Sequence, residues 1–150
     1  MMMAEELDRT VRREVYDTVM KTGRPPLAAE VAGSLGAGLG EVQASFDRLA
    51  AGHVLVLQAG SGEILMANPF SAVPTPFAVE AEGQQYFGNC IWDALGIPAM
   101  LNRDATISAS CGCCGLSMPL EVRNGELQPS EGVVHFAVPA RLWWENIVFT

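Results

Sequence analysis

Apolar residues recur at helical spacing through the first third of the chain. One occurs every four positions in the first segment: Leu7, Val11, Val15 and Val19. This spacing predicts an amphipathic helix over residues 4 to 21, ended by Gly23 and a pair of prolines. A short second helix is predicted over residues 26 to 36, and a third over residues 39 to 52, where Val42, Phe46 and Leu49 form one apolar stripe.

The pattern changes after the third predicted helix. Residues 53 to 67 (HVLVLQAGSGEILMA) contain two apolar runs around a Gly-Ser-Gly turn, which is typical of a β-hairpin. Residues 1 to 67 are therefore predicted to form a winged-helix-like three-helix module. Residues 68 to 76 contain three prolines and little periodicity, so a semi-extended linker is expected there.

Short strand patterns dominate residues 77 to 150. Hairpins are predicted at Glu82-Gly83 and Asn124-Gly125, and alternation over residues 105 to 111 predicts a half-buried strand with Cys111 on its apolar side. Further expectations are a strand over residues 133 to 138, a short helix over 139 to 147 and a final strand over 147 to 150. The predicted fold class is α+β, with the helical module followed by a mostly antiparallel β domain that carries short helices.

Composition and charge narrow the function. The chain has 150 residues, 49% of them hydrophobic, which is enough to bury a core. Its formal net charge of -8 disfavours binding to nucleic acid or to an anionic membrane, because phosphate binding draws on clustered Lys and Arg. No apolar run reaches the length of a membrane span, so cytoplasmic residence is expected. The third predicted helix carries Glu41, Asp47 and Arg48, so a structural role for the module is favoured over DNA reading.

Cys90 and Asp93 are the first candidate for chemistry. Asn89 is a favourable N-cap, which predicts Cys90 at the first helical position and Asp93 one turn later on the same face. The helix dipole favours a thiolate at Cys90, while an ionised Asp93 opposes it. A soft ligand beside a proton donor suits bond cleavage at a soft metal centre. The alternative is a buried cysteine next to an ordinary capping aspartate.

The run CGCCG is the second candidate. Cys111 and Cys114 have the spacing of a zinc-binding pair, but a structural zinc site normally needs a second pair. A redox pair would normally begin a helix in a βαβ unit, and this run lies between predicted strands. The alternative is a tight glycine turn in which Cys113 and Cys114 are small filling residues.

Histidines and tryptophans carry weaker signals. His53 and His135 lie in apolar, strand-like segments without a ligand-spaced partner, so structural roles are expected for both. Trp92, Trp143 and Trp144 are expected in the core or at an interface, because burial is the commoner role of aromatic residues.

The order of motifs over residues 70 to 150 resembles the alkylmercury (organomercurial) lyase family. The similarity rests on VPTPFAVEAEGQQYFGNCIWDALGIPAML followed by ATISASC: a hairpin, an aromatic segment, C-x-x-D opening a helix, and a strand ending in cysteine. The resemblance implies that Cys90 and Asp93 are catalytic and that Cys111 is mainly structural. It also implies cleavage of carbon-mercury bonds by protonolysis to a hydrocarbon and Hg(II), in mercury resistance and detoxification. The expected partners are an organomercurial molecule and small external thiols that accept the product, with no organic cofactor.

One departure from the family pattern affects the expected metal ligands. The resemblance implies a second catalytic cysteine on a strand downstream of the short helix, near WWENIVFT, and no cysteine stands there. Either the sequence is truncated or it has diverged, in which case Cys113 or Cys114 is expected to join Cys90 and Asp93 as a mercury ligand. A noncatalytic thiol protein that binds Hg, Cu or Zn through Cys90 and the CGCC run is the alternative function.

Overall fold

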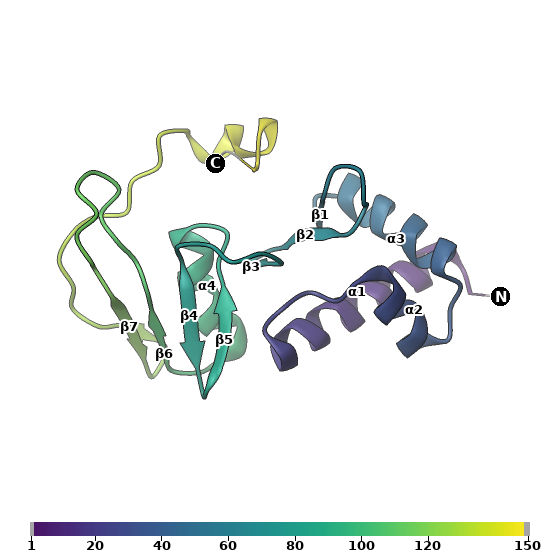
Figure 1. Cartoon of the computed structure of the whole chain (residues 1–150), viewed down its shortest axis with the longest axis horizontal. Helices are drawn as coiled ribbons and strands as arrows, with labels where there is room; N and C mark the ends of the chain where they lie inside the picture. The colour runs from purple at the N-terminus through teal and green to yellow at the C-terminus, as the bar shows by residue number, and fades with distance from the viewer. Residues whose placement is uncertain (1, 149–150) are drawn as a thin grey trace.

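The N-terminal module contains the three predicted helices. In this computed structural model, which describes residues 2–148, they are α1 (Ala4–Thr22), α2 (Ala28–Leu35) and α3 (Leu39–Ala51) (Figure 1). Each helix begins and ends within two residues of the predicted positions. Among the described residues, no helix combines the length and the apolar character that crossing a membrane requires.

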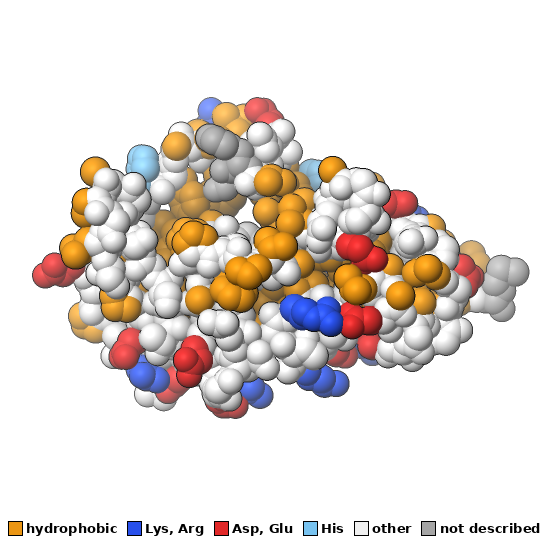
Figure 2. All heavy atoms as spheres, in the orientation of Figure 1, with side chains coloured by type: hydrophobic (Ala, Val, Ile, Leu, Met, Phe, Trp, Pro, Cys, Tyr) orange, Lys and Arg blue, Asp and Glu red, His pale blue; other side chains and the backbone are white. Residues whose placement is uncertain are grey.

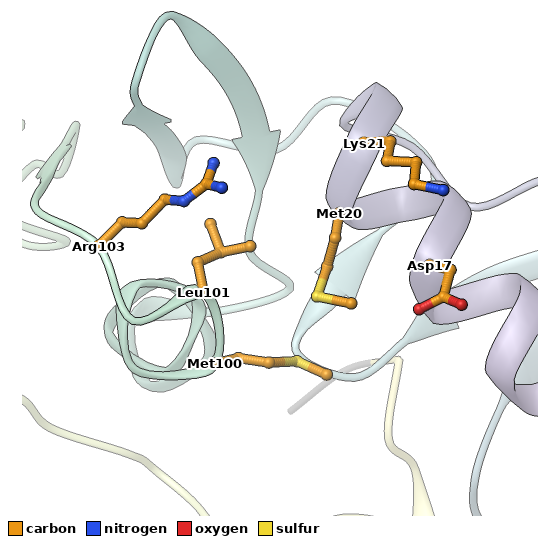
Figure 3. Close-up of a pocket in the computed structure, with 6 residues that line it drawn as sticks. All are labelled: Asp17, Met20, Lys21, Met100, Leu101 and Arg103. Atoms are coloured by element: carbon orange, nitrogen blue, oxygen red, sulfur yellow. The ribbon is translucent and has the colours of Figure 1, made fainter.

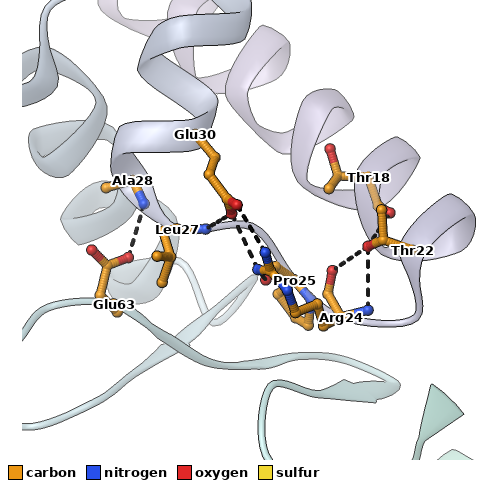
Figure 4. Close-up of polar contacts among 8 residues, drawn as sticks. All are labelled: Thr18, Thr22, Arg24, Pro25, Leu27, Ala28, Glu30 and Glu63. Atoms are coloured by element: carbon orange, nitrogen blue, oxygen red, sulfur yellow. Dashed lines mark hydrogen bonds and ion pairs between the residues drawn. The ribbon is translucent and has the colours of Figure 1, made fainter.

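The connection between α1 and α2 is held by side-chain contacts to backbone groups (Figure 4). Gly23 ends α1 with a φ of 85°, in the left-handed region that glycine adopts without strain. Glu30 accepts the Leu27 amide at 2.8 Å and pairs with Arg24 at 2.8 Å. Glu63, from the following hairpin, accepts the Ala28 amide at 2.8 Å. These bonds satisfy amides at the start of α2 and fix that helix against the hairpin.

Arg48, the basic residue of α3, is engaged with α1. Its guanidinium lies 2.7 Å from the Asp8 carboxylate, which also accepts the buried Ser45 hydroxyl at 2.6 Å. Hydrogen bonds from Arg48 hold the pKa of Asp8 below its ordinary value. The charge on α3 thus joins helices together, in line with the structural role expected for this module.

A small antiparallel sheet follows the helices. It has the order β1-β2-β3, from β1 (Val56–Leu57), β2 (Ile64–Ala67) and β3 (Phe70–Ser71). The predicted hairpin is confirmed, but the segment predicted as a linker contains β3, and its Phe70 is fully buried. Prolines on either side of this strand hid its short apolar element from the sequence pattern.

The second sheet has the order β5-β4-β6-β7-β8, with every neighbouring pair antiparallel. Its strands are β4 (Ala78–Ala81), β5 (Gln84–Phe87), β6 (Ala105–Ile107), β7 (Leu120–Arg123) and β8 (Glu126–Leu127). Both predicted hairpins are confirmed, and their turn residues all have positive φ: Glu82, Gly83, Asn124 and Gly125. The helix α4 (Ile91–Leu101) packs on β4 and β6 (Figure 1).

Two hydrophobic cores lie side by side, and α1 contributes to both. Val11 and Val15 belong to the core of the helical module, whereas Val19 belongs to the core between α4 and the second sheet. The Tyr86 hydroxyl also donates a 2.6 Å hydrogen bond to the Met20 carbonyl of α1. The α+β class is therefore confirmed, with one helix shared by both halves.

The strand predicted over residues 133 to 138 is wrong. These residues have no strand structure, and the side chain of Val133 is 93% exposed. An apolar run becomes a strand only where a sheet edge receives it, and the edge strand β8 is itself two exposed residues long. The predicted short helix is a 3-10 helix, Ala140–Glu145. The final predicted strand is wrong at residues 147 and 148, which form a turn, and its last two residues lie outside the described part.

The C-terminal segment runs along the top of the view in Figure 1, from the second sheet toward the helical module. There the ring of Trp144 stacks on the ring of His53, with centroids 4.0 Å apart and planes 4° from parallel. On the face shown in Figure 2, hydrophobic side chains form a band and the surface is hollowed beneath this segment. None of the three tryptophans is buried, and Trp92 is 63% exposed, so the predicted core role is wrong, and the alternative of an interface role stays a prediction.

Candidate functional site

Cys90 stands at the N-terminus of α4, in the short loop that leaves β5. It is the N-cap residue, with φ -150° and ψ -178°, and Ile91 is the first helical residue. The prediction that Asn89 caps the helix is wrong by one residue, because the Asn89 side chain bonds elsewhere. Asp93 lies in the first turn of α4, as predicted, and both Cys90 and Asp93 are half-buried.

Gly88 fixes how closely this loop approaches the helix. A Cβ atom at this position would lie 2.7 Å from the Ala94 nitrogen and 2.9 Å from its Cα. Its amide donates to the Phe77 carbonyl at 3.0 Å, and its carbonyl accepts the Thr75 hydroxyl at 2.6 Å. The backbone before Cys90 is therefore held on both sides, and no larger residue fits at Gly88 without a shift.

Asn89 organises the polar side of the site. Its amide nitrogen donates to Asn68 Oδ1 at 3.1 Å, to the Phe70 carbonyl at 3.3 Å and to Asp93 Oδ2 at 3.0 Å. The side-chain oxygen of Asn89, Oδ1, is buried and has no hydrogen-bond partner among the described residues. A buried acceptor of this kind can accept a hydrogen bond from a group that is present during only part of a reaction.

Burial dominates the electrostatics of Cys90 and Asp93. It raises the pKa of the Cys90 thiol, and the nearby Asp93 charge adds to this effect, while the amides of Asp93 and Trp92 that face the sulfur oppose it. Burial also raises the pKa of the Asp93 carboxyl, and the hydrogen bond from Asn89 opposes that change. Both groups thus hold their protons more tightly than in water, so Asp93 is suited to donate one.

Tyr16 connects the site to α1. Its hydroxyl donates to the Asn68 carbonyl at 2.9 Å, and the Asn68 side chain accepts from Asn89. Burial raises the pKa of Tyr16, with a lowering effect from Arg12 and a raising effect from Asp93. A chain of polar contacts therefore runs from the N-terminal helix to Asp93. Sequence reasoning missed Tyr16 and Asn68, because nothing in the linear order brings them to residue 93.

The predicted position of Cys111 at the end of a half-buried strand is wrong. The ladder between β6 and β7 stops at Ile107 and Leu120, and an isolated bridge joins Ser110 to Ser117. Pro119 stands opposite the interruption and has no N–H to donate to the ladder. Cys111 consequently lies beyond the strand and is half-buried.

Residues 111 to 115 form a turn that gathers thiols. The Cys111 amide donates to the Leu116 carbonyl at 2.8 Å, and the Gly115 amide donates to the Cys111 carbonyl at 2.8 Å. Hydrogen bonding to the Cys111 sulfur from the amides of Cys114 and Cys113, and from the Cys114 thiol, lowers the pKa of Cys111. Cys113 and Cys114 are exposed.

The structure brings Cys90 together with Asp93 but keeps the CGCC turn apart from them. Among the described residues, no three His, Cys, Asp or Glu side chains are gathered closely enough to hold a metal ion. The predicted set of Cys90, Asp93, Cys113 and Cys114 is therefore not assembled. A structural role for Cys111 stays a prediction.

The two histidines lie outside the strands in which they were predicted. His53 adopts a φ of 60° in the turn that follows α3, and His135 lies exposed in the segment that forms no strand. The ring of His53 stacks on that of Trp144, and a structural role for His53 stays a prediction.

Comparison with known proteins finds a family and relatives that this chain resembles. The sequence pattern of the alkylmercury lyase (MerB) family matches residues 70–150, just over half of the chain. An alkylmercury lyase of Staphylococcus epidermidis is 36% identical over 70 residues, which are 45% of this chain and 32% of the relative. One of Streptomyces lividans is 33% identical over 69 residues, 44% of this chain and 32% of the relative. The chain thus matches about a third of the length of these relatives.

A solved structure shares the fold. The crystal structure of the mercury-bound form of MerB2 superposes with a TM-score of 0.65 over 82% of this chain and 59% of that chain. The sequences are 23% identical in this comparison, so the likeness concerns the fold.

Proposed function

Because the chain belongs to the alkylmercury lyase family, we propose that it cleaves carbon-mercury bonds by protonolysis, releasing a hydrocarbon and Hg(II). One observation supports this proposal above the others. Cys90 caps α4, and Asp93 stands in the first turn of the same helix, held at 3.0 Å by the Asn89 amide. A soft ligand and a proton donor are thereby fixed at one helix end.

The first proposed step is capture of the substrate by Cys90. The thiol of Cys90 displaces a ligand X from R–Hg–X, forming a sulfur-mercury bond and releasing HX. Mercury is soft and prefers thiolate ligands, so this exchange is favourable even though burial raises the pKa of the free thiol. The amides of Trp92 and Asp93 and the positive end of α4 stabilise negative charge on the sulfur during the exchange.

The second proposed step is proton transfer from Asp93. The protonated carboxyl gives its proton to the carbon bound to mercury, the carbon-mercury electron pair forms the new C–H bond, and RH leaves. Mercury stays on Cys90 as Hg(II), and Asp93 becomes a carboxylate that still accepts from Asn89. Burial raises the pKa of Asp93, which favours the protonated carboxyl that this step needs. External small thiols then take the Hg(II) from Cys90, and no organic cofactor is needed.

The test is release of benzene from phenylmercury acetate in the presence of excess small thiol, measured in the headspace. The full chain is compared with Cys90→Ser and Asp93→Ala, and with Asp104→Ala as a matched control at an exposed aspartate beyond the C-terminal end of α4. We expect multiple turnovers in the full chain and in the control, and none above background in the first two variants. A folded protein that takes up mercury but releases no benzene would refute the proposal.

The turn at residues 111 to 115 favours a second candidate function. Cys111 and Cys114 lie in contact within a turn closed by two backbone hydrogen bonds, and the pKa of Cys111 is lowered by hydrogen bonds to its sulfur. Two thiolates suffice for Hg(II) or Cu(I), which accept near-linear coordination. This turn then acts as a soft-metal site that is separate from Cys90.

Metal titration of a Cys90→Ser variant tests this second function. We expect one equivalent of Hg(II) to bind, with ultraviolet thiolate-to-metal absorption, and this signal to disappear when Cys111 and Cys114 are also changed to serine. Cys113→Ser in the same background is the control and should keep the site. A signal that persists without Cys111 and Cys114 would exclude it.

A further inference from the structure

A positively charged groove runs between α1 and α4, although the protein as a whole is acidic. Two adjoining pockets, of about 490 Å³ and 260 Å³, share Asp17 and Met100 as lining residues. The cationic residues that line them are Arg9, Arg12, Arg13, Lys21 and Arg103. The whole chain has 9 Lys and Arg, so more than half of its positive side chains border this one groove. Such a concentration favours an anionic ligand.

Most of these charges form no ion pair with another residue that the structure describes. Within the described residues, Arg9, Arg12, Arg13 and Lys21 form no ion pair, whereas Arg103 pairs with Glu82 at 3.1 Å. The three arginines lie on a face of α1 that is rotated away from its buried valines. An arginine guanidinium matches a carboxylate in shape and can donate two parallel hydrogen bonds to it.

The walls of the groove include apolar surface. Figure 3 shows Met20 of α1 and Met100 of α4 extending into the space between the two helices, with Lys21 and Arg103 nearby. In the larger pocket, Tyr16 and Met100 stand beside the arginines. Apolar walls next to guanidinium groups suit a small organic carboxylate better than a fully hydrated inorganic anion.

Asn68 joins this groove to the site at Cys90. It lines the larger pocket, its carbonyl accepts the Tyr16 hydroxyl, and its side chain accepts from Asn89. Asn89 precedes Cys90 in the chain and holds Asp93. The charges of Arg12 and Asp93 both act on the same Tyr16 hydroxyl. Neither pocket is lined by Cys90 or Asp93, so the link between the groove and the site consists of the contacts of Tyr16 and Asn68 that lead through Asn89 to Asp93.

We propose that the arginine face of α1, with Arg12 at its centre, binds a carboxylate carried by the mercury compound that Cys90 captures. This rests on the proposed function, which supplies the mercury compound. The carboxylate has two possible sources, the organic group bound to mercury or the thiol that accompanies it. In either case the groove selects anionic substrates and holds them in position for Cys90.

The experiment measures the rate of mercury capture at Cys90 by mass spectrometry, so it does not depend on bond cleavage. A background with Cys111, Cys113 and Cys114 changed to serine removes competing thiols, and circular dichroism checks its folding. The first arm compares 4-carboxyphenylmercury with phenylmercury. The second compares phenylmercury bound to 3-mercaptopropionate with phenylmercury bound to 2-mercaptoethanol. Each rate is divided by the rate with free cysteine, which corrects for intrinsic reactivity.

We expect capture of the carboxylated compound to be about tenfold faster in at least one arm at low salt, and this preference to fall at high salt. The arm that shows it identifies the source of the carboxylate. Arg12→Gln should reduce the preference at least about threefold, Arg12→Lys should restore part of it, and Arg123→Gln on β7 should not change it. Equal rates in both arms, or a preference unchanged in Arg12→Gln, would overturn the inference. Capture without hydrocarbon release would refute the proposed function and leave this inference standing.

Discussion

The pKa values of Cys90 and Cys111 are shifted in opposite directions, although both side chains are half-buried and backbone amides face both sulfurs. At the start of α4, burial outweighs the amides and raises the pKa of Cys90. In the turn at residues 111 to 115, hydrogen bonds from Cys114 and Cys113 act with little opposition from burial and lower the pKa of Cys111. Burial is thus the largest effect on the pKa of Cys90, whereas hydrogen bonds to the sulfur are the largest effect on the pKa of Cys111.

The two regions also differ in how firmly their backbones are held. The loop before Cys90 carries Gly88, which contacts Ala94 closely, and it lies over the second core. The turn that holds Cys111 projects beyond the sheet, and among the described residues after Ile107 Val122 alone is buried. Preorganisation at Cys90 suits a reaction that needs a fixed proton donor, whereas an exposed turn suits simple binding.

Changing Asp93 to asparagine should have the largest effect and should concern the α4 site alone. We expect Asp93→Asn to lower the rate of benzene release about 100-fold to 10,000-fold, because the amide has no proton to give. Alkylation of Cys111 is the internal control and should keep its rate. If the variant kept full turnover, Asp93 would not be the proton donor.

The same variant should gain stability at neutral pH. Burial raises the pKa of Asp93 above its ordinary value of 3.8, so the folded protein binds this proton more tightly than the unfolded chain. Ionisation above pH 3.8 therefore costs folding free energy, and asparagine avoids this cost. We expect a higher Tm for Asp93→Asn than for the unmodified protein at pH 7, and no difference near pH 3.

Alanine in place of glycine tests the difference in backbone constraint. Gly88→Ala should lower the free energy of unfolding by about 1–3 kcal/mol, because the new Cβ meets the backbone of Ala94. Gly112→Ala in the CGCC turn is the matched control, since no atom lies within 4 Å of the position of its Cβ. It should change the free energy by less than about 0.5 kcal/mol in urea denaturation. Equal effects would show that the two loops are equally constrained.

Thiol labelling compares the two sulfurs directly and carries the smallest expected difference. We expect iodoacetamide to modify Cys111 about tenfold faster than Cys90 at pH 7, since the thiolate reacts and its fraction is larger at Cys111. Followed by peptide mass spectrometry, the midpoint of labelling against pH should lie below 9.0 for Cys111 and above 9.0 for Cys90. The reverse order would contradict the role given to burial.

Local patterns predicted most of the elements but not their mutual contacts. The valine spacing of α1, the Gly-Ser-Gly turn and the Asn124-Gly125 turn each depend on neighbouring residues, and each prediction is confirmed. The strand prediction for residues 133 to 138 failed because an apolar run becomes a strand only where it pairs with a sheet edge. No local pattern reports whether such pairing occurs. The pairing of Cys90 with Asp93 was visible because both stand on one helical turn.

The remaining parts of the site come from distant positions. Tyr16 reaches Asn68 across 52 residues of chain, and Asn89 reaches Asn68 across 21. The position of Cys111 depended on Pro119, which interrupts the opposite strand. Each of these contacts is decided by tertiary packing.

The shared helix α1 has a consequence for how this protein can be divided. The family pattern begins at residue 70, yet Val19 fills part of the core beneath α4, and the Met20 carbonyl accepts the Tyr86 hydroxyl. A fragment that starts at the family boundary would expose that core and lose the helix that forms one side of the groove between α1 and α4. The smallest piece able to melt as one cooperative unit is therefore larger than the segment by which the family is recognised.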